Sequence, residues 1–539
     1  MTVKTYDYII AGAGSAGCAM AARLTENSNI NVLLLEAGGK DNTMKITVPA
    51  MIIDVVKPNK LNWNYWTEPQ EHLNNRELFW PRGKVLGGSS AINGMIYIRG
   101  HQRDYDEWAQ LGCKGWSFDD VLPFFKKAEG NNRTDDALHN SKGPLGVEQH
   151  TSVHPLNEAF LSAAAELGLP KTDDFNGHQQ EGVGWYDQTI RQGRRQSTAR
   201  TYLNEAKDRQ NLTILTDAQV TRVVLEGKKA TGVELMRNGQ KEVWKAGREV
   251  ILCGGAINSP QILQLSGIGD PSDIQAVGLP VLHELSGVGK NMQDHLDMLL
   301  SAHLKDPISM LKYKRPDRGI MELMKWALRK PGVLSDCVTP VGAFLKTDKA
   351  LERPDLQFHI MLAMADKSHG LAEPHEHGFG VHICQLRPHS RGTISLTSAD
   401  PIAPAKIDPR YLDFDEDLRV MREGCKIIRR MYRQPALASY ISKEKDPWHG
   451  VDIDDDEATN AIIRDKAETI YHPVGTCTMG PRDNKNSVVD PDLKVIGLEG
   501  LRVVDASVMP RLIGGNTNAP TIMIAEKCAD LIKSELALT

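Results

Sequence analysis

The sequence YDYIIAGAGSAG, residues 6–17, joins a short apolar run to a turn that contains three spaced glycines. The next residues, CAMAARLTEN, are rich in small and helix-forming side chains. A second apolar run, NVLLL at 31–35, follows and ends at Glu36. The order strand, GxGxxG turn, helix, strand and acid is the fingerprint of a Rossmann-type dinucleotide-binding unit. We therefore expect a dinucleotide cofactor at this end of the chain.

Each part of this fingerprint has a physical function. Gly12 allows the tight turn, Gly14 lets the backbone approach a pyrophosphate, and Gly17 lets the helix pack closely on the strand. The free amide groups at the start of the helix attract phosphate. Glu36 is placed to accept hydrogen bonds from a ribose. An acid at this position suits both FAD and NAD, so the fingerprint alone does not choose between them.

The composition excludes several classes of protein. A chain of 539 residues exceeds one ordinary core, so two domains are expected. The formal net charge of -5, with acids and bases well mixed, argues against a nucleic-acid partner. The eight cysteines form no CxxC pair, which disfavours disulfide scaffolding and favours a reducing compartment. His472 and Cys477 are one potential ligand pair without an evident second, so we expect no metal.

The N-terminal sequence bears on the location of the protein. It runs directly into the first strand and leaves no room for the apolar core and cleavage site of a signal peptide. No run of eighteen apolar residues occurs, so we expect no membrane-spanning segment. The sequence therefore predicts a cytoplasmic protein.

The rest of the chain contains a second glycine-rich loop and a change of character in the middle. The loop GKVLGGSSAING, at 83–94, carries backbone donors that suit a phosphate or the polar edge of a planar ring. Residues 212–253 are predicted to form strands with tight turns, among them Asn238-Gly239. The segment 305–460 has more charge, Pro and His, and it contains alternating strands such as LQFHI at 356–360, which indicates a separate sheet-based unit.

Four features, taken in order, resemble one known family. They are the fingerprint up to Glu36, GKVLGGSSAINGMIYIRG at 83–100, GAINSPQILQLSGIG at 255–269, and the pair YHPVGTCTMG at 471–480 with GGNTNAPTIMIAEKCAD at 514–530. Over essentially its whole length the chain resembles the glucose–methanol–choline (GMC) oxidoreductases. The resemblance implies FAD rather than NAD as the cofactor.

The resemblance also implies the fold. We expect an α/β protein (α+β overall) with a discontinuous Rossmann-like FAD-binding domain, formed by residues 1–155, 193–304 and 465–539. An interleaved substrate-binding domain, formed by 156–192 and 305–464, is expected to be built on an antiparallel sheet flanked by helices.

Two residues are implied to be catalytic. In this family the histidine of the HPxGTxxMG-type stretch lies over the flavin beside its reactive nitrogen, and His472 occupies that position. A second polar residue faces it, and Asn516 matches that one. Alcohol oxidation removes a proton from oxygen and a hydride from carbon. An imidazole, with an ordinary pKa near ~6.5, is suited to take the proton, and an amide can hold the substrate oxygen without competing for it.

The expected contacts to FAD come from the two glycine-rich loops and from the C-terminal stretches. They are Gly12, Gly14, Ser15, Ala16, Gly17, Glu36, Ala37, Trp66, Gly83, Val85, Gly88, Ser89, Asn93, Gly94, Met95, Ile96, Val220, Asp505, Ala506, Asn516 and Thr517.

The sequence departs from some members of the family. Certain choline-oxidising members attach FAD covalently through a histidine just before the asparagine of the GGxSxxN loop, and Ile92 stands there, so we expect non-covalent FAD. Choline-specific members also carry a glutamate that faces the ammonium group. The nearest stretch, TPVGAF at 339–344, has no carboxylate, although Asp336 lies close by in the sequence. A buried cation without a counter-charge is costly, which weakens choline as the substrate.

The resemblance leaves several functions open. The first is an FAD-dependent dehydrogenase that oxidises a primary alcohol or polyol and passes electrons to a quinone-like acceptor. The alternatives are a choline dehydrogenase and an alcohol oxidase that uses O₂. A decarboxylase, a lyase or a non-catalytic protein on the same fold is disfavoured, because His472 and Asn516 are both retained. Neither the alcohol nor the oligomeric state follows from the sequence.

The segment KYKRPDRGIMELMKWALRK, residues 312–330, predicts a basic amphipathic helix. It contains seven Lys or Arg against one Asp and one Glu. The apolar residues recur on one helical face, at Ile320, Leu323, Met324, Ala327 and Leu328. Such a helix either packs its apolar face on the substrate domain or lies in the interface of an anionic bilayer, as a peripheral contact with the inner membrane.

Overall fold

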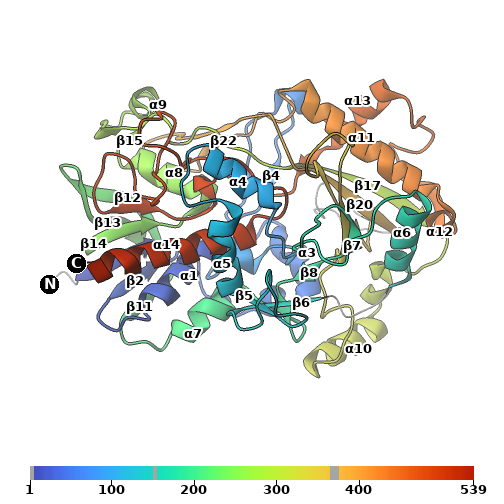
Figure 1. Cartoon of the computed structure of the whole chain (residues 1–539), viewed down its shortest axis with the longest axis horizontal. Helices are drawn as coiled ribbons and strands as arrows, with labels where there is room; N and C mark the ends of the chain where they lie inside the picture. The colour runs from blue at the N-terminus through green and yellow to red at the C-terminus, as the bar shows by residue number, and fades with distance from the viewer. Residues whose placement is uncertain (1–4, 150–153, 365–375, 539) are drawn as a thin grey trace.

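The computed structural model describes residues 5–149, 154–364 and 376–538. Within these residues the chain forms two seven-stranded sheets that lie at opposite ends of the molecule, with helices packed around them (Figure 1). The predicted combination of an α/β unit and an antiparallel sheet is confirmed.

The first sheet contains the fingerprint strands. Its strand order is β11-β2-β1-β14-β13-β12, and β25 also pairs with β14. The pairs of β1 with β2 and β14, of β11 with β2, and of β25 with β14 are parallel, whereas β12, β13 and β14 form an antiparallel meander. The bounds are Thr5–Ala11 for β1, Val32–Leu35 for β2, Leu212–Leu215 for β11, Ala218–Glu226 for β12, Lys229–Arg237 for β13, Gln240–Leu252 for β14 and Leu501–Val503 for β25.

The turn between β13 and β14 has the predicted chemistry. Asn238 and Gly239 both have positive φ, 51° and 74°, and Arg237 pairs with Gln240 across the turn. A two-residue turn with positive φ at both positions matches the twist of the flanking strands, which explains the Asn-Gly sequence. The predicted hairpin is confirmed.

The helices on the first sheet bring both ends of the chain together. Helix α1, Ser15–Leu24, packs against α14, Asn518–Leu538. Arg23 donates to both oxygens of the fully buried Glu526 carboxylate, with its shortest hydrogen bonds at 2.7 and 2.8 Å, and the Tyr202 hydroxyl donates another at 2.6 Å. Because every member of this group is paired, the buried charge fixes α14 on the Rossmann unit.

The second sheet is antiparallel throughout. Its order is β23-β17-β20-β19-β18-β7, and β24 also pairs with β17. Helix α11, Asp415–Tyr432, contacts β17 and β20, and α6 (Pro155–Glu166) and α13 (Asp456–Lys466) pack against α11. The strand bounds are Gly182–Trp185 for β7, Leu296–Leu304 for β17, Val341–Leu345 for β18, Leu356–Met361 for β19, Gly378–Gln385 for β20, Ile441–Glu444 for β23 and Glu468–Thr469 for β24.

Strand β19 shows why this sheet positions polar side chains. Leu356, Phe358 and Ile360 belong to the hydrophobic core of the second sheet. The alternate residues Gln357 and His359 are equally buried, at 0% and 2% exposure. The alternation in the sequence therefore does not mark a solvent-exposed face, because the polar face of this strand is enclosed by the rest of the protein.

The sheets differ in which segments of the chain they use. The first sheet takes strands from 5–35, 212–252 and 501–503, and most strands of the second come from 182–185 and 341–444. Strand β17, which lies within the segment 193–304, joins the second sheet. The division into an FAD-binding and a substrate-binding domain, with the bounds given above, stays a prediction.

Candidate active site and cofactor cavity

A cavity of about 350 Å³ is lined by residues from both sheets. One part of it lies at the carboxyl ends of β1, β2 and β14, where Gly12, Glu36 and Cys253 line it. Side chains of the second sheet, His359 and His382, line another part. In open α/β sheets, ligands bind at the carboxyl ends of the strands, so the position is that of a cofactor site.

Most of the residues implied by the family resemblance line this cavity. They are Gly12, Gly14, Ser15, Ala16, Glu36, Ala37, Gly83, Gly88, Ser89, Asn93, Gly94, Met95, Ile96, Val220, His472, Asp505, Ala506, Asn516 and Thr517.

Three of the implied residues lie outside the lining. A Cβ atom on Gly17 would stand 1.8 Å from the Gly12 oxygen, so Gly17 serves the close packing of helix on strand. The side chain of Trp66 is about half exposed, and its ring packs on Phe79. Val85 is fully buried in a small core cluster that includes Ile92.

The two glycine loops touch backbone to backbone beside the cavity. A Cβ atom on Gly88 would lie 2.7 Å from the Cα of Gly14, and Gly88 has φ of +51°. A Cβ atom on Gly12, which has φ of +106°, would lie 2.5 Å from the Cys253 oxygen. Helix α1 starts at this contact without a side-chain cap and without an acid in its first turn. Its free amide groups therefore face the cavity, and such a cradle fits the pyrophosphate of FAD.

Glu36 ties the first glycine loop to the end of β2. Its carboxylate accepts hydrogen bonds from the amides of Ala13, at 3.0 Å, and Gly38, at 2.8 Å. Burial raises the pKa of Glu36 to about 7, and the two amide donors oppose that rise. The carboxylate thus shapes the loop and also lines the cavity, where it retains lone pairs for a ribose hydroxyl.

At the other end of the cavity, three side chains form a continuous hydrogen-bonded chain. The Nε2 atom of Gln357 donates to the Oδ1 atom of Asn516 at 3.1 Å. The Nδ2 atom of Asn516 is then directed at Nε2 of His472, 3.2 Å away. Gln357 therefore fixes which side of the Asn516 amide faces the imidazole.

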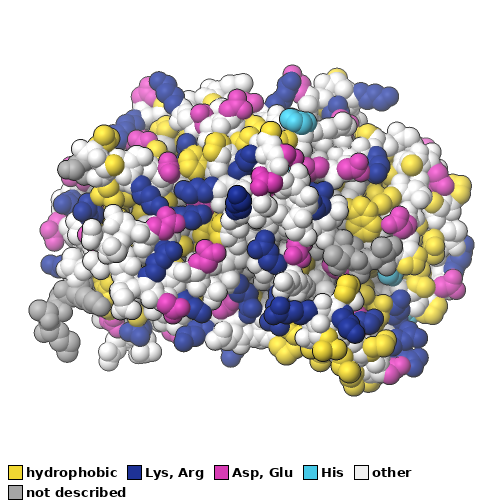
Figure 2. Space-filling view, turned by 60° about the horizontal axis from the view of Figure 1, so that its bottom comes forward, with side chains coloured by type: hydrophobic (Ala, Val, Ile, Leu, Met, Phe, Trp, Pro, Cys, Tyr) yellow, Lys and Arg dark blue, Asp and Glu magenta, His cyan; other side chains and the backbone are white. Residues whose placement is uncertain are grey.

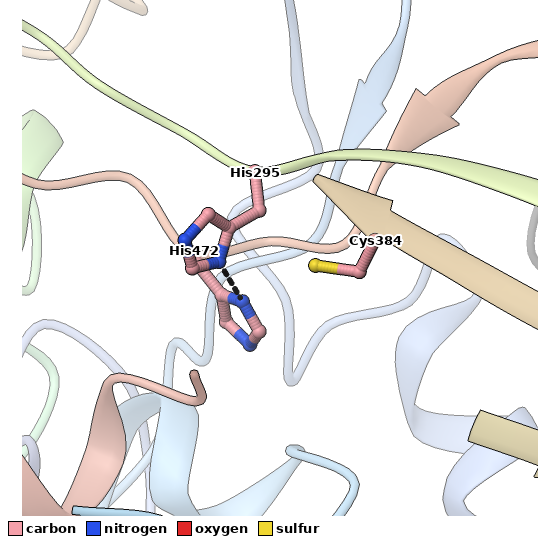
Figure 3. A group of neighbouring side chains, drawn as sticks. All are labelled: His295, Cys384 and His472. Carbon is pink, nitrogen blue, oxygen red and sulfur yellow. Dashed lines mark hydrogen bonds between the residues drawn. The ribbon is translucent and has the colours of Figure 1, made fainter. Parts of the chain in front are cut away.

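The second nitrogen of His472 meets another imidazole. Nδ1 of His472 lies 3.0 Å from Nδ1 of His295, and the two rings are perpendicular (Figure 3). Because Nε2 accepts from Asn516, a neutral His472 ring carries its proton on Nδ1 and donates it to His295. The backbone amide of His472 donates to Asp294 at 2.7 Å, which fixes the chain on the same side.

Burial keeps these imidazoles neutral. It lowers the pKa of His472 well below its ordinary value, and His295 and Arg82 add to the effect. Burial, with a contribution from Arg387, lowers the pKa of His295 to about 3. His472 therefore presents an unprotonated Nε2 to the cavity at neutral pH, which is the state required of a general base.

Cys384 lies beside this pair of histidines (Figure 3). The ligand atoms of His295, Cys384 and His472 are within 4.8 Å of one another, the one such grouping found within the described residues. Burial raises the pKa of the Cys384 thiol well above its ordinary value, and a neutral thiol is a poor metal ligand. Cys477, the partner considered from the sequence, is not part of this group. The expected absence of a metal stays a prediction.

Sequence reasoning did not find His295, Gln357 or His359. His295 precedes β17, and Gln357 and His359 are alternate residues of β19. The one usable signal was the polar alternation within a strand whose other residues are large and apolar. That pattern is equally typical of a half-exposed strand, so only the enclosed position of β19 distinguishes the two.

Comparison with known proteins identifies the family of this chain. Family models described as GMC oxidoreductase match residues 6–297 and 388–525. This chain belongs to the GMC oxidoreductase family. The mitochondrial choline dehydrogenase of Homo sapiens is 43% identical, with 99% of this chain and 90% of the relative covered. An alcohol dehydrogenase (acceptor) of Pseudomonas putida is 45% identical, with 98% and 95% covered.

Solved structures support the fold. Pyridoxine 4-oxidase from Mesorbium loti superposes with a TM-score of 0.89 at 30% identity, covering 98% of this chain and 99% of the other. The resemblance stated from the motifs is therefore confirmed. The protein is an FAD-dependent oxidoreductase that acts on CH–OH donors.

Replacing Glu36 tests the link between the glycine loop and the cofactor. In Glu36→Gln one amide donor, of Ala13 or Gly38, faces an NH₂ group instead of an acceptor. We expect the dissociation constant for FAD to rise about tenfold or more, the usual effect of losing a charged hydrogen bond. A titration of apoprotein with FAD measures it. Glu234→Gln, a buried acid outside the cavity, is the control. Equal FAD affinity in Glu36→Gln and wild type would contradict the assignment of Glu36 to the cofactor site.

Replacing Gln357 tests whether the amide of Asn516 must be held. Gln357→Leu removes the donor, so the Asn516 amide can rotate away from His472. We expect the anaerobic rate of flavin reduction to fall about tenfold, in the range of a lost positioning contact, with FAD content unchanged. Gln264→Leu removes a comparable buried amide that lies outside the cavity lining and should leave the rate unaffected. Equal rates in the two variants would show that Gln357 has no positioning role.

Proposed function

We propose that the protein oxidises an uncharged primary alcohol or polyol, with His472 as general base and Asn516 as the group that holds the substrate oxygen. One observation carries this proposal. The paired nitrogens His472 Nε2 and Asn516 Nδ2 lie 3.2 Å apart in the wall of the cavity that the glycine loops also line. A substrate hydroxyl that takes the place of this bond would donate to Nε2 and accept from the Asn516 NH₂ group.

His472, Asn516 and Gln357 each have a separate role in the proposed reaction. Bound FAD supplies the hydride acceptor. His472 Nε2 takes the hydroxyl proton, and its Nδ1–H remains directed at His295. Asn516 holds the oxygen through its NH₂ group, and Gln357 prevents that amide from turning. Burial holds the pKa of His472 well below its ordinary value, which keeps the base unprotonated at neutral pH.

The lining of the cavity favours an uncharged substrate over choline. Among the described lining residues the carboxylates are Glu36 and Asp505. Glu36 serves the first glycine loop, and Asp505 accepts hydrogen bonds from Gly255 and Ser259. Around His472 the lining includes Val338, Thr339, His359, Met361, His382 and Ile470, without a carboxylate. Asp336 is buried outside the lining, and a quaternary ammonium would be left without a counter-charge.

Choline remains the second candidate, because several of the similar proteins are choline dehydrogenases. We propose a quinone-like molecule as the electron acceptor. The similarity to an alcohol dehydrogenase named for an acceptor supports this choice over O₂.

The test is anaerobic bleaching of the flavin with a panel of alcohols. We expect primary aliphatic alcohols or polyols to reduce the flavin faster than choline does at equal concentration. His472→Ala should retain FAD but reduce it about 10² to 10⁴ times more slowly, the range for the loss of a general base. Choline as the fastest substrate would overturn the substrate proposal, and near-wild-type reduction by His472→Ala would overturn the assignment of the base.

We propose further that FAD is held without a covalent bond. Ile92, which stands where covalent members carry histidine, lines the cavity and has no nucleophilic atom. Acid precipitation should therefore release all the yellow colour into the supernatant. A protein pellet that keeps its flavin after washing would contradict this proposal.

A further inference from the structure

Helix α10, Pro316–Ala327, protrudes at the edge of the molecule beyond the second sheet (Figure 1). None of its residues lines the cofactor cavity. The predicted helix at 312–330 is thus present, preceded by a short 3₁₀ turn at Met310–Lys314. We propose that α10 is a docking surface for an anionic lipid bilayer. The proposal does not rest on the identity of the substrate.

The apolar face of α10 points away from the protein. Ile320 is 60% exposed, Met324 59% and Leu328 64%. Met321 and Leu323 are also exposed. The sequence left open whether this face packs on the substrate domain, and the structure shows that it does not. Figure 2 shows hydrophobic side chains gathered over this part of the molecule, with Lys and Arg beside them.

The side of α10 that faces the protein is held by polar contacts. The indole Nε1 of Trp326 donates to the Gly193 oxygen at 2.7 Å, and Arg194 lies over the ring at 5.1 Å. Glu322, buried to 3% exposure, accepts from the Val333 amide at 3.1 Å and from Lys325 at 2.6 Å. These contacts determine the rotation of the helix, so its outward apolar face is a fixed property of the fold.

The charge of the segment selects an anionic partner. Residues 312–330 contain seven Lys or Arg and two acids, a formal net charge of +5, whereas the whole chain carries -5. Both acids are already paired within the segment, Asp317 with Arg315 and Glu322 with Lys325. Basic residues on either side of an apolar face match a bilayer in which anionic headgroups surround the acyl chains.

A second copy of the chain fits this face poorly. A twelve-residue helix is about 18 Å long and ~10 Å wide, so its outer face covers roughly 200 Å². A stable protein interface buries about 800 Å² on each partner. A two-fold dimer would also place the same basic patch on both sides and oppose like charges. Neither the small contact area nor the repulsion of like charges applies to an anionic bilayer, because its headgroups supply the counter-charge and its acyl layer is far larger than the helix.

A bilayer contact at α10 would be peripheral. None of the helices in the described part of the chain combines the length and hydrophobicity needed to span a bilayer. Docking through α10 would hold the enzyme at the surface from which a lipid-soluble electron acceptor is reached.

Co-sedimentation of the FAD-loaded enzyme with vesicles tests the proposal. At low ionic strength we expect pelleting with vesicles of phosphatidylcholine and phosphatidylglycerol, and little pelleting with phosphatidylcholine alone. Raising the salt should weaken binding, since the screening length is about 10 Å at 0.1 M and falls further at higher salt. Failure of the wild type to pellet with anionic vesicles at low salt, with FAD bound and turnover of a soluble dye intact, would overturn the proposal.

Two variants separate the apolar and the electrostatic contributions. The triple variant Ile320→Gln, Leu323→Gln and Met324→Gln removes the apolar face. The triple variant Lys314→Gln, Arg318→Gln and Lys330→Gln removes basic charge. Each should lower vesicle binding about tenfold or more and leave dye turnover unchanged.

Matched controls lie elsewhere on the surface. Val243, Leu282 and Ile402 are half exposed, and Lys207, Lys229 and Lys349 are exposed. Changing either trio to Gln should not alter binding. The proposal fails if the α10 variants bind as wild type does. It also fails if sedimentation velocity shows a wild-type dimer that the apolar α10 variant abolishes, since the face would then be a protein interface.

Discussion

The contact between the backbones of Gly14 and Gly88 is the constraint on which the site depends. It joins the Rossmann turn after β1 to a loop 74 residues later, and a Cβ atom at Gly88 would overlap the Gly14 backbone. Two loops at this distance place their amide groups on one wall of the cavity, beside the free start of α1. The Glu36 carboxylate then fixes the first loop, because it accepts hydrogen bonds from the backbone amides of Ala13 and Gly38.

Charge is distributed differently in the scaffold and at the catalytic end of the cavity. Buried ion pairs such as Arg23 with Glu526 and Arg99 with Glu129 join helices and loops and are fully hydrogen-bonded. Around His472 the hydrogen-bonding side chains are instead amides and imidazoles, and the charged groups nearby are Arg82 and Asp294. Full burial there makes any unpaired charge costly, which lowers the pKa of His472 and favours a neutral substrate.

The sequence predicted the elements whose chemistry is local. The glycine fingerprint, the Asn238-Gly239 turn and the positions of His472 and Asn516 in the cavity wall all followed from short motifs, the last two through the family resemblance. Contacts between distant segments could not be predicted in this way. The bond from Gln357 to Asn516 joins residues 159 positions apart, and that between His295 and His472 joins residues 177 apart. No local pattern contains such a pairing, since it arises only when the two sheets close on the cavity.

Strand β19 and helix α10 show a second limit of sequence reasoning, and it is the same in both. Periodicity correctly divided each element into an apolar and a polar side, yet it could not say what each side faces. In β19 the polar side, with Gln357, is enclosed and orients Asn516. In α10 the apolar side is exposed, while Glu322 and Trp326 bind the protein. Stability alone would favour apolar side chains at the enclosed polar positions of β19 and burial of the apolar side of α10. The enclosed polar side of β19 orients Asn516 at the site proposed for the substrate hydroxyl, and the exposed apolar side of α10 is the surface proposed to dock on a bilayer.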